Sequence, residues 1–518
     1  MVASAEDQTI TRNLFVALRW LPALAAAAYL ATVAVLGSRV VESVGWDTDA
    51  SGAFALAERL RGNGPVHMAH AGDWTALWWM LATRGLPWHM ELWKASGYLF
   101  TVVAAVLLWW ATSRIAGRWA GVTAAAIMLV VAGPFTLRAL VSLSAHVITP
   151  VGAVILGVGL VLLTRRTWWV AGCVGVVAGA NAASDPLLWF AGVIPFALAG
   201  GLLAWSTRRI DVGIRAGVTI VVTALSALTT NAVMHALDFH TVPLDAGLSP
   251  VRDLPSNIRH LGRMIALLGG ANYAIPGPYP REPLRALLAL LVFVAVAAPI
   301  VAAVLFTIRR VEPTKRAYAC YWGAASALLS IVFVVTPNAA DLGPKSSNYL
   351  LALTPAAGVG VALLASTSVA RQLAVGFAVA TIAAVNISSI RDGRAEVTGL
   401  AALETYEQPL RALLEREGVT RGYAGYWDAQ NLSWQNDMRL LVAPVANCGT
   451  QLCPTNIFTI RSWYEPRGGP TFLLVDPTVN VIHAPPFAAR ARATHRFGPM
   501  TLYVFDYDIA RHIRVPAG

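Results

Sequence analysis

Residues 283–308 read PLRALLALLVFVAVAAPIVAAVLFTI, a run in which Arg285 carries the only charge. A helix that crosses a lipid bilayer needs about 20 mainly apolar residues, so this run predicts a membrane span. The chain contains ten further runs of this general kind, of which 168–183 and 349–366 are short for a span. They are residues 14–37, 96–113, 119–134, 149–164, 168–183, 186–207, 212–236, 317–337, 349–366 and 372–390.

The composition agrees with lipid as the main solvent. Of the 518 residues, 56% are hydrophobic and 13% are charged, whereas about a quarter of a soluble protein is charged. The net charge of +11 does not indicate nucleic-acid binding, because the basic residues form short clusters between apolar runs. The expected fold is a polytopic α-helical bundle of about eleven membrane helices.

Alternate connections between the runs are basic, and this pattern sets the expected orientation. Basic loops lie on the cytoplasmic side of a membrane, so the N-terminus is expected in the cytoplasm and the chain after residue 390 outside it. A cleaved signal peptide is the alternative, but it would break the alternation. We expect a cytoplasmic-membrane protein with a transmembrane module at 1–390 and an extracytoplasmic domain at 391–518. The basic clusters are Arg114/Arg118, Arg165/Arg166, Arg208/Arg209, Arg309/Arg310/Lys315/Arg316 and Arg371.

Three segments on the outer side, 38–95, 237–282 and the C-terminal part, are too long to be simple connections, and such loops are usually functional. In the first, Thr48 and Asp49 predict the start of a helix over 50–62. Trp74, Leu77 and Trp78 then predict a short helix that lies in the headgroup layer. The alternative is a helix packed on the bundle.

The C-terminal part predicts an α+β domain. Leucines spaced along 400–414 indicate an amphipathic helix that ends near Gly418, and four strands are expected at 422–427, 438–442, 471–475 and 501–505. Cys448 and Cys453 predict a small disulfide-closed loop outside the cytoplasm. Cys173 and Cys320 lie in apolar runs and are expected to be packing residues.

Candidate catalytic residues follow from position. Most predicted spans carry no charge at their centre, which argues against an ion-coupled carrier. Asp47 and Asp49 follow the first span closely, and a carboxylate at the membrane edge can act as a general base toward a sugar hydroxyl. The plainer interpretation is that Asp49 caps a helix and Asp47 is solvated.

Further polar residues are expected at the same rim. Arg138, Ser142 and His146 are spaced to share one helix face that could grip a phosphate, although an arginine reaching toward headgroups explains the pattern equally well. The same alternatives apply to a second basic cluster, where headgroup contact is the favoured interpretation. That cluster is Arg259, His260 and Arg263.

Asp185 followed by Pro186 is a common helix start and a weaker candidate for substrate contact. Lys345 precedes Tyr349 at the same rim and could face a phosphate.

His67, His70 and Asp73 carry ligand-type side chains at helical spacing, but no fourth partner is evident. The two interpretations are a metal site and ordinary polar loop residues, and the second is favoured.

The layout resembles the GT-C superfamily of membrane glycosyltransferases, whose members share a cytoplasmic N-terminus and a large first outer loop with acidic residues. Residues 45–49 (GWDTD) match the position of the family's catalytic aspartate, and 348–355 (NYLLALTP) resemble a turn found in relatives. Residues 422–429 (GYAGYWDA) and 503–508 (YVFDYD) resemble actinobacterial members that handle arabinofuranose or mannose.

The resemblance implies transfer of a sugar from a polyprenyl-phosphate donor to a cell-envelope glycan, with inversion and no required metal. Asp47 or Asp49 would deprotonate the acceptor, and a basic rim would stabilise the departing lipid phosphate. Arabinofuranose is the first expectation and mannose the second. Two alternatives are a lipid-linked-glycan flippase and a non-catalytic envelope scaffold. The rim residues are Arg138, His146, Arg259, Arg263 and Lys345.

Overall fold

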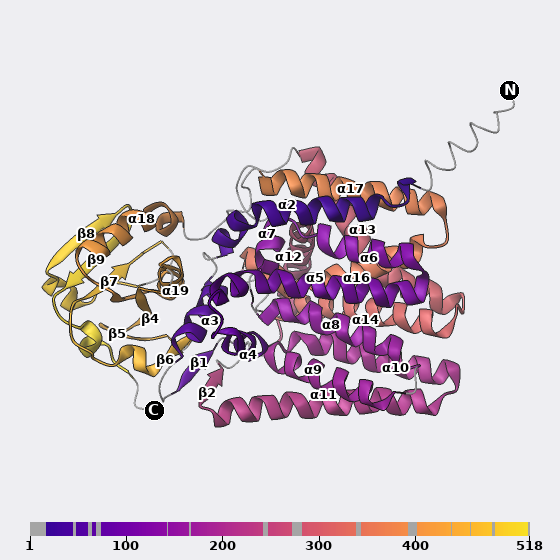
Figure 1. Ribbon diagram of the computed structural model, residues 1–518, viewed down its shortest axis with the longest axis horizontal. Coiled ribbons are helices and arrows are strands. Elements are labelled where there is room, and N and C mark those ends of the chain that lie inside the picture. Colours follow the sequence, from indigo (N-terminus) through magenta and orange to yellow (C-terminus); the bar gives the residue numbers. More distant parts are fainter. Residues whose placement is uncertain are drawn as a thin grey trace.

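The protein folds as a helical bundle with a C-terminal α/β region at one end (Figure 1). The computed structural model describes residues 17–44, 48–60, 65–68, 74–141, 143, 145–164, 167–241, 247–271, 282–337, 343–391, 401–436, 438–455, 457–478 and 482–515.

Each of the eleven apolar runs corresponds to a helix. Within the described residues, six helices are long and apolar enough to cross a membrane, which makes this a multi-pass membrane protein. These six are α5 (His89–Ala116), η1 with α10 (Trp189–Val193, Ile194–Thr207), α11 (Ile210–Ala236), α13 (Glu282–Ile308), α14 (Pro313–Val335) and α17 (Val369–Arg391). The others are α2 (Leu21–Val44), α6 (Arg118–Val130), α8 (Ala145–Leu162), α9 (Trp168–Ser184) and α16 (Leu353–Ala365).

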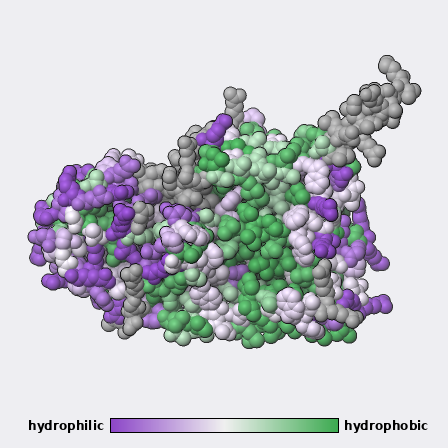
Figure 2. All heavy atoms as spheres, in the orientation of Figure 1, coloured by the Kyte–Doolittle hydropathy of each residue, from purple (hydrophilic) through white to green (hydrophobic). Residues whose placement is uncertain are grey.

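The surface of the bundle is apolar where lipid would surround it. Figure 2 shows hydrophobic residues covering the middle of the bundle, while the C-terminal region is largely hydrophilic. Leu225 is 58% exposed and Leu228 is 67% exposed, and both belong to α11. An exposed apolar surface on a folded bundle is explained by a lipid solvent rather than by water.

Helix α16 packs with its backbone directly against two neighbouring helices. A Cβ atom added at Gly360 would lie 2.2 Å from the nitrogen of Pro299 in α13. One added at Gly358 would lie 2.3 Å from the carbonyl oxygen of Ala124 in α6. Small residues allow membrane helices to approach this closely, so glycine sets the spacing at the centre of the bundle.

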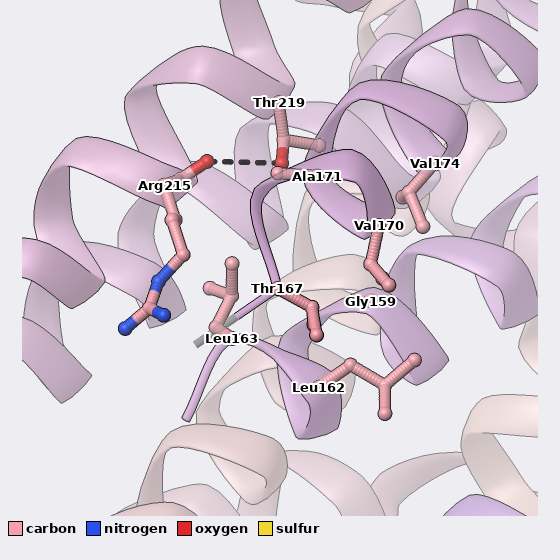
Figure 3. A pocket seen from close by; sticks show the side chains of 9 residues that line it. All are labelled: Gly159, Leu162, Leu163, Thr167, Val170, Ala171, Val174, Arg215 and Thr219. Atoms are coloured by element: carbon pink, nitrogen blue, oxygen red, sulfur yellow. Dashed lines mark hydrogen bonds between the residues drawn. The ribbon is translucent and has the colours of Figure 1, made fainter. Parts of the chain in front are cut away.

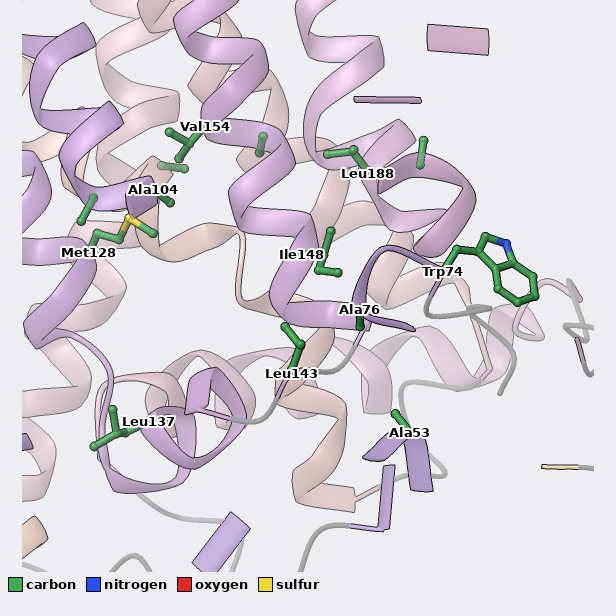
Figure 4. Close-up of a cluster of buried hydrophobic side chains, with 14 of the residues drawn as sticks. Ala53, Trp74, Ala76, Ala104, Met128, Leu137, Leu143, Ile148, Val154 and Leu188 are labelled. Carbon is green, nitrogen blue, oxygen red and sulfur yellow. The ribbon is translucent and has the colours of Figure 1, made fainter. Parts of the chain in front are cut away.

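The buried apolar core continues from the bundle into the first outer segment. That segment forms α3 (Thr48–Arg59), β1 (Val66–Met68) and α4 (Trp74–Thr83). Figure 4 shows Ala104 and Val154 of the bundle in the same cluster as Trp74 of α4 and Ala53 of α3. These outer elements are therefore packed as part of the fold.

The contacts of helix α4 distinguish between a helix that lies in the headgroup layer and one that packs on the bundle. Trp74 and Leu77 are buried, and the indole nitrogen of Trp74 donates a hydrogen bond to Oδ1 of Asn231 in α11 at 2.8 Å. Trp78 is 39% exposed. Helix α4 therefore packs on the bundle through Trp74 and Leu77, and of these three residues only Trp78 is exposed.

The C-terminal region contains a six-stranded sheet in the order β5-β4-β3-β7-β9-β8. The central strands β4, β3 and β7 are parallel, and the outer strands pair antiparallel. The region is therefore α/β with a mixed sheet, and the expected α+β class holds only in part. Parallel neighbours need a crossover, and α19 supplies the one between β3 and β4. The bounds are α18 (Ala401–Arg416), β3 (Arg421–Ala424), α19 (Tyr426–Gln435), β4 (Leu441–Cys448), β5 (Gln451–Pro454), β7 (Thr471–Val475), β8 (Ala493–Phe497) and β9 (Met500–Phe505).

Two local features of this region bear on the sequence expectations. The strand expected over 422–427 ends at Ala424, because the chain enters α19 at Tyr426. Cys448 and Cys453 form a disulfide, with Cα atoms 6.0 Å apart, that closes the hairpin between β4 and β5.

A second, three-stranded sheet joins the three long outer segments. Its order is β2-β1-β6, where β2 is Phe239–Thr241 and β6 is Thr459–Ile460. Val66 of β1 lies opposite Phe239 on one side and Ile460 on the other. Beside this sheet, the rings of Phe54 in α3 and Trp434 in α19 stack with centroids 4.6 Å apart. The C-terminal region is thus attached to both outer segments of the bundle.

Helical spacing is the wrong description for His67, which lies in the strand β1 opposite His240 of β2. The two rings have centroids 5.8 Å apart, and His235 lies 6.1 Å from His240. Burial lowers the pKa of His67, with a further lowering from His240 that Asp238 opposes. His70 and Asp73 lie outside the described residues.

This arrangement predicts that the three-stranded sheet weakens in acid. The pKa of His67 is lower in the folded state than the ordinary value of 6.5 that applies in the unfolded chain. Below pH 6.5 the unfolded chain therefore binds a proton at this residue more readily than the folded protein does, and this favours unfolding. Stability should be full above that pH and should fall as the pH drops below it. Limited proteolysis of the segment around β1 at pH 7.5 and pH 5.5 would measure the loss. His67→Gln should show a smaller pH response than wild type, and an equal response in both would contradict the assignment.

Candidate functional site

The connection between α9 and η1 places a buried carboxylate at the end of the bundle nearest the C-terminal region. Asp185 follows the last residue of α9 and is 1% exposed. Its Oδ1 accepts a hydrogen bond from the backbone nitrogen of Leu187 at 3.0 Å. This contact satisfies a donor at the start of the next helical turn, as a capping aspartate does.

The second oxygen of Asp185 is used differently. Its Oδ2 accepts hydrogen bonds from the hydroxyl of Thr149 and from Nδ1 of His146, the latter at 3.0 Å. Both donors belong to α8, which packs against α9. A carboxylate can only accept, so the proton of the imidazole is held on Nδ1. Asp185 therefore fixes the orientation of His146 as well as capping a helix.

The short helix η3 (Gly343–Leu350) brings two more side chains to this end of the bundle. The ring of Tyr349 meets the ring of His146 edge to face, with centroids 4.5 Å apart and an interplanar angle of 76°. One turn earlier, the hydroxyl of Ser346 lies 2.8 Å from Nε2 of His260. A single segment thus contacts both histidines.

His260 belongs to α12 (Leu254–Leu268), which lies beside α14. Its ring stacks on Phe333 of α14 with centroids 5.9 Å apart. Arg259 and Arg263 on the same helix are exposed. Among the described residues, no hydrogen bond or ion pair joins either arginine to Asp185 or His146. On α12, the side chain of His260 therefore faces the bundle, whereas those of Arg259 and Arg263 face outward.

Other candidates lie partly or wholly beyond what the structure describes. Asp47 is outside the described residues, and Asp49 lies in the first turn of α3 with its side chain outside them. The backbones of Arg138 and Lys345 lie in α7 (Pro134–Val141) and η3, but their side chains are likewise not described.

The expectation that Arg138, Ser142 and His146 share one helix face is wrong. Helix α7 ends at Val141 and α8 begins at Ala145, so Arg138 and His146 belong to different helices. The i, i+4, i+8 spacing holds only within one continuous helix, and this break removes it.

A metal site finds no support in the parts of the chain that the structure describes. There, no group of three or more His, Cys, Asp and Glu side chains is arranged to hold an ion. Of the three candidate ligands, His67 lies opposite His240 in the three-stranded sheet. His70 and Asp73 fall on residues that the structure does not describe.

No family model matches the chain, and no curated protein does. A matching solved structure is the crystal structure of ArnT from Cupriavidus metallidurans bound to undecaprenyl phosphate. The identity is 12%, the TM-score is 0.49, and the match covers 92% of this chain and 97% of that chain. At these values the likeness carries no argument, and function has to be inferred from the site.

The arrangement around His146 has a definite chemical capacity. A buried carboxylate that accepts from one imidazole nitrogen fixes the orientation of the ring. His146 has 24% of its side chain exposed, so it can be reached from outside the bundle. When protonated, such a ring can bind an anion through Nε2, and when neutral it can accept a proton from a hydroxyl. Sequence reasoning named His146 and Asp185 separately, and no sequence signal paired them.

Proposed function

We propose that this protein is a glycosyltransferase that moves a sugar from a polyprenyl-phosphate donor to a cell-envelope glycan. The observation that supports this best is the pair of Asp185 and His146 at the end of a membrane bundle. A lipid-phosphate donor presents its anion at the membrane surface, where an oriented imidazolium is well suited to meet it. Three outer segments converge at the same end, which leaves protein available to bind a glycan.

In the proposed reaction the hydroxyl oxygen of the acceptor attacks the anomeric carbon of the donor sugar. The bond between that carbon and the phosphate oxygen breaks, and the lipid phosphate leaves with the electron pair. His146, held by Asp185, neutralises the charge that develops on the leaving phosphate. Asp47 or Asp49 accepts the proton of the hydroxyl, as the resemblance to GT-C enzymes implies, and the anomeric centre is inverted.

The finer features of the proposal follow from the sequence. Arabinofuranose is the first expected sugar and mannose the second. The active end of the bundle is proposed to face outward from the cytoplasmic membrane, with the N-terminus in the cytoplasm. Arg138 and Lys345 are proposed to hold the lipid phosphate beside His146. No metal is proposed to take part.

Sugar transfer in purified membranes tests this proposal and should depend on one aspartate. Decaprenyl-phosphate-arabinose or polyprenyl-phosphate-mannose would be supplied with a glycan acceptor to wild type, Asp47→Asn and Asp49→Asn. We expect one variant to lose transfer by about a hundredfold or more, the scale of a positioned general base. Asp253→Asn is the matched control, because Asp253 has an exposed side chain in an outer segment and lies outside the proposed site.

Two outcomes would count against the proposal in different ways. If both aspartate variants transferred like the control, the assignment of the base would be wrong. If wild type transferred neither sugar but moved the intact lipid-linked sugar between leaflets, the protein would be a flippase.

A further inference from the structure

Helices α10 and α11 connect at the end of the bundle away from the C-terminal region (Figure 1). A basic pocket lies at this connection. Its volume is about 560 Å³. Arg215 reaches this end of the molecule from α11. It also lines a second, separate pocket, which Figure 3 draws, and there its side chain lies beside Leu163. The residues that line the pocket are Trp168, Arg208, Arg209, Ile210, Asp211 and Arg215.

The pocket carries a positive charge that its own residues do not neutralise. Asp211 is bonded by Arg209, with Nη2 and Oδ2 2.8 Å apart, and by Arg215. Arg208 is exposed, and no ion pair joins it to an acidic side chain of the described residues. Three guanidinium groups against one carboxylate leave a net charge of +2.

The carboxylate and an aromatic ring hold these cations in place. The Arg215 side chain is 2% exposed, and its guanidinium lies 5.8 Å from the ring centroid of Trp168. A cation over an indole face is stabilised by the ring. The pocket also contains the first residues of α11, a helix of 27 residues whose N-terminus attracts negative charge. The site is therefore preorganised for an anion.

The surroundings of the pocket indicate that its anion belongs to a lipid and is not a soluble ion. Arg208 and Arg209 separate two helices that are long enough to span a membrane, so the pocket opens at the level of the lipid headgroups. Beside it, Trp169 is 70% exposed, Trp205 is 79% exposed and Ile210 is 80% exposed. Tryptophans are enriched at this boundary of the bilayer, and a soluble anion would leave these apolar side chains uncovered.

We propose that this pocket binds the phosphate headgroup of an anionic phospholipid, with the acyl chains covering the exposed tryptophans. Arginines between membrane helices bind such headgroups through charge-assisted hydrogen bonds. The site lies at the opposite end of the bundle from His146 and does not depend on the proposed transferase activity.

Lipid retention by the full-length protein tests the proposal. The protein would be reconstituted in phosphatidylcholine nanodiscs with a minor fraction of phosphatidylglycerol, and the lipids that remain bound would be counted by native mass spectrometry. Wild type should retain phosphatidylglycerol selectively. Arg208→Glu places a negative charge where a positive one faced the lipid phosphate, and it should lower that selectivity by about tenfold or more.

Arg310→Glu is the matched control. Arg208 and Arg310 each follow a membrane helix at the same end of the bundle, and both have positive φ, 54° and 47°. Arg310 does not line the pocket, so its variant should keep the selectivity of wild type. Equal losses in the two variants would show that only the general surface charge attracts lipid. Displacement of the bound lipid by millimolar inorganic phosphate would show a site for a soluble anion. Either result would overturn the proposal.

Discussion

Replacing His146 with glutamine should lower sugar transfer by about a hundredfold or more while the protein stays folded. The expected loss is that of removing a charged group aimed at the leaving phosphate, which typically costs 10²–10³ in rate. Glutamine retains a polar group of similar reach, and the side chain of His146 is partly exposed, so the bundle should assemble normally. The loss should appear in kcat, and the product polyprenyl phosphate should also inhibit the variant less strongly than it inhibits wild type.

Two companion variants separate orientation from chemistry. Asp185→Asn keeps the shape of the side chain and removes the charge that holds His146, so it should also lose most of its kcat. Thr149→Val removes only the other hydrogen bond to Oδ2 of Asp185 and should have a much smaller effect. If Asp185→Asn and Thr149→Val lowered activity only in proportion to folded protein, Asp185 would be a helix cap and nothing more.

The second large effect is expected at the centre of the bundle, where Gly360→Ala should prevent normal assembly. The added methyl group would lie 2.2 Å from the nitrogen and 2.5 Å from Cδ of Pro299, and 2.6 Å from the carbonyl carbon of Ala298. None of these atoms belongs to a flexible side chain, so α13 and α16 would have to separate. Overpacking of this kind costs roughly 1–3 kcal/mol or more. Thermal unfolding of purified protein, followed by size-exclusion chromatography, would measure the effect.

Gly201→Ala is the control for this experiment. A Cβ atom at Gly201 in α10 has no neighbour within 4 Å, and alanine favours a helix over glycine by about 1 kcal/mol. The control should therefore unfold at the same temperature as wild type or slightly above it. An unchanged unfolding temperature for Gly360→Ala would mean that the two helices are free to separate.

The helices were predictable because the solvent imposes them. In lipid each backbone polar group must be satisfied within the chain, so a long apolar run has to be a helix. Position 349 shows the limit of this reasoning. The run expected to begin at Tyr349 becomes helix α16 only at Leu353, after the tight turns of η3. Hydropathy does not distinguish one helical geometry from another.

The site was less predictable because it depends on contacts between distant residues. Asp185 and Pro186 indicated a helix start, and the structure shows that contact with Leu187. The partnership with His146 depends on how α8 packs against α9, which no local pattern records. The relative direction of two strands also cannot be predicted from their local sequences. The strands β3 and β4 are parallel because α19 forms the crossover between them.

The three-stranded sheet has a consequence for the order in which the protein is made. The strand β1 leaves the ribosome long before β2 and much longer before β6, because its partners Phe239 and Ile460 come from distant parts of the chain. At roughly 5–20 residues per second, these delays are on the order of tens of seconds. Both edges of β1 lack a neighbour until β2 is made, and one edge stays open until β6 follows. The newly made protein therefore passes through a period in which an open strand edge is available to other chains, and that period ends only when the last domain has been synthesised.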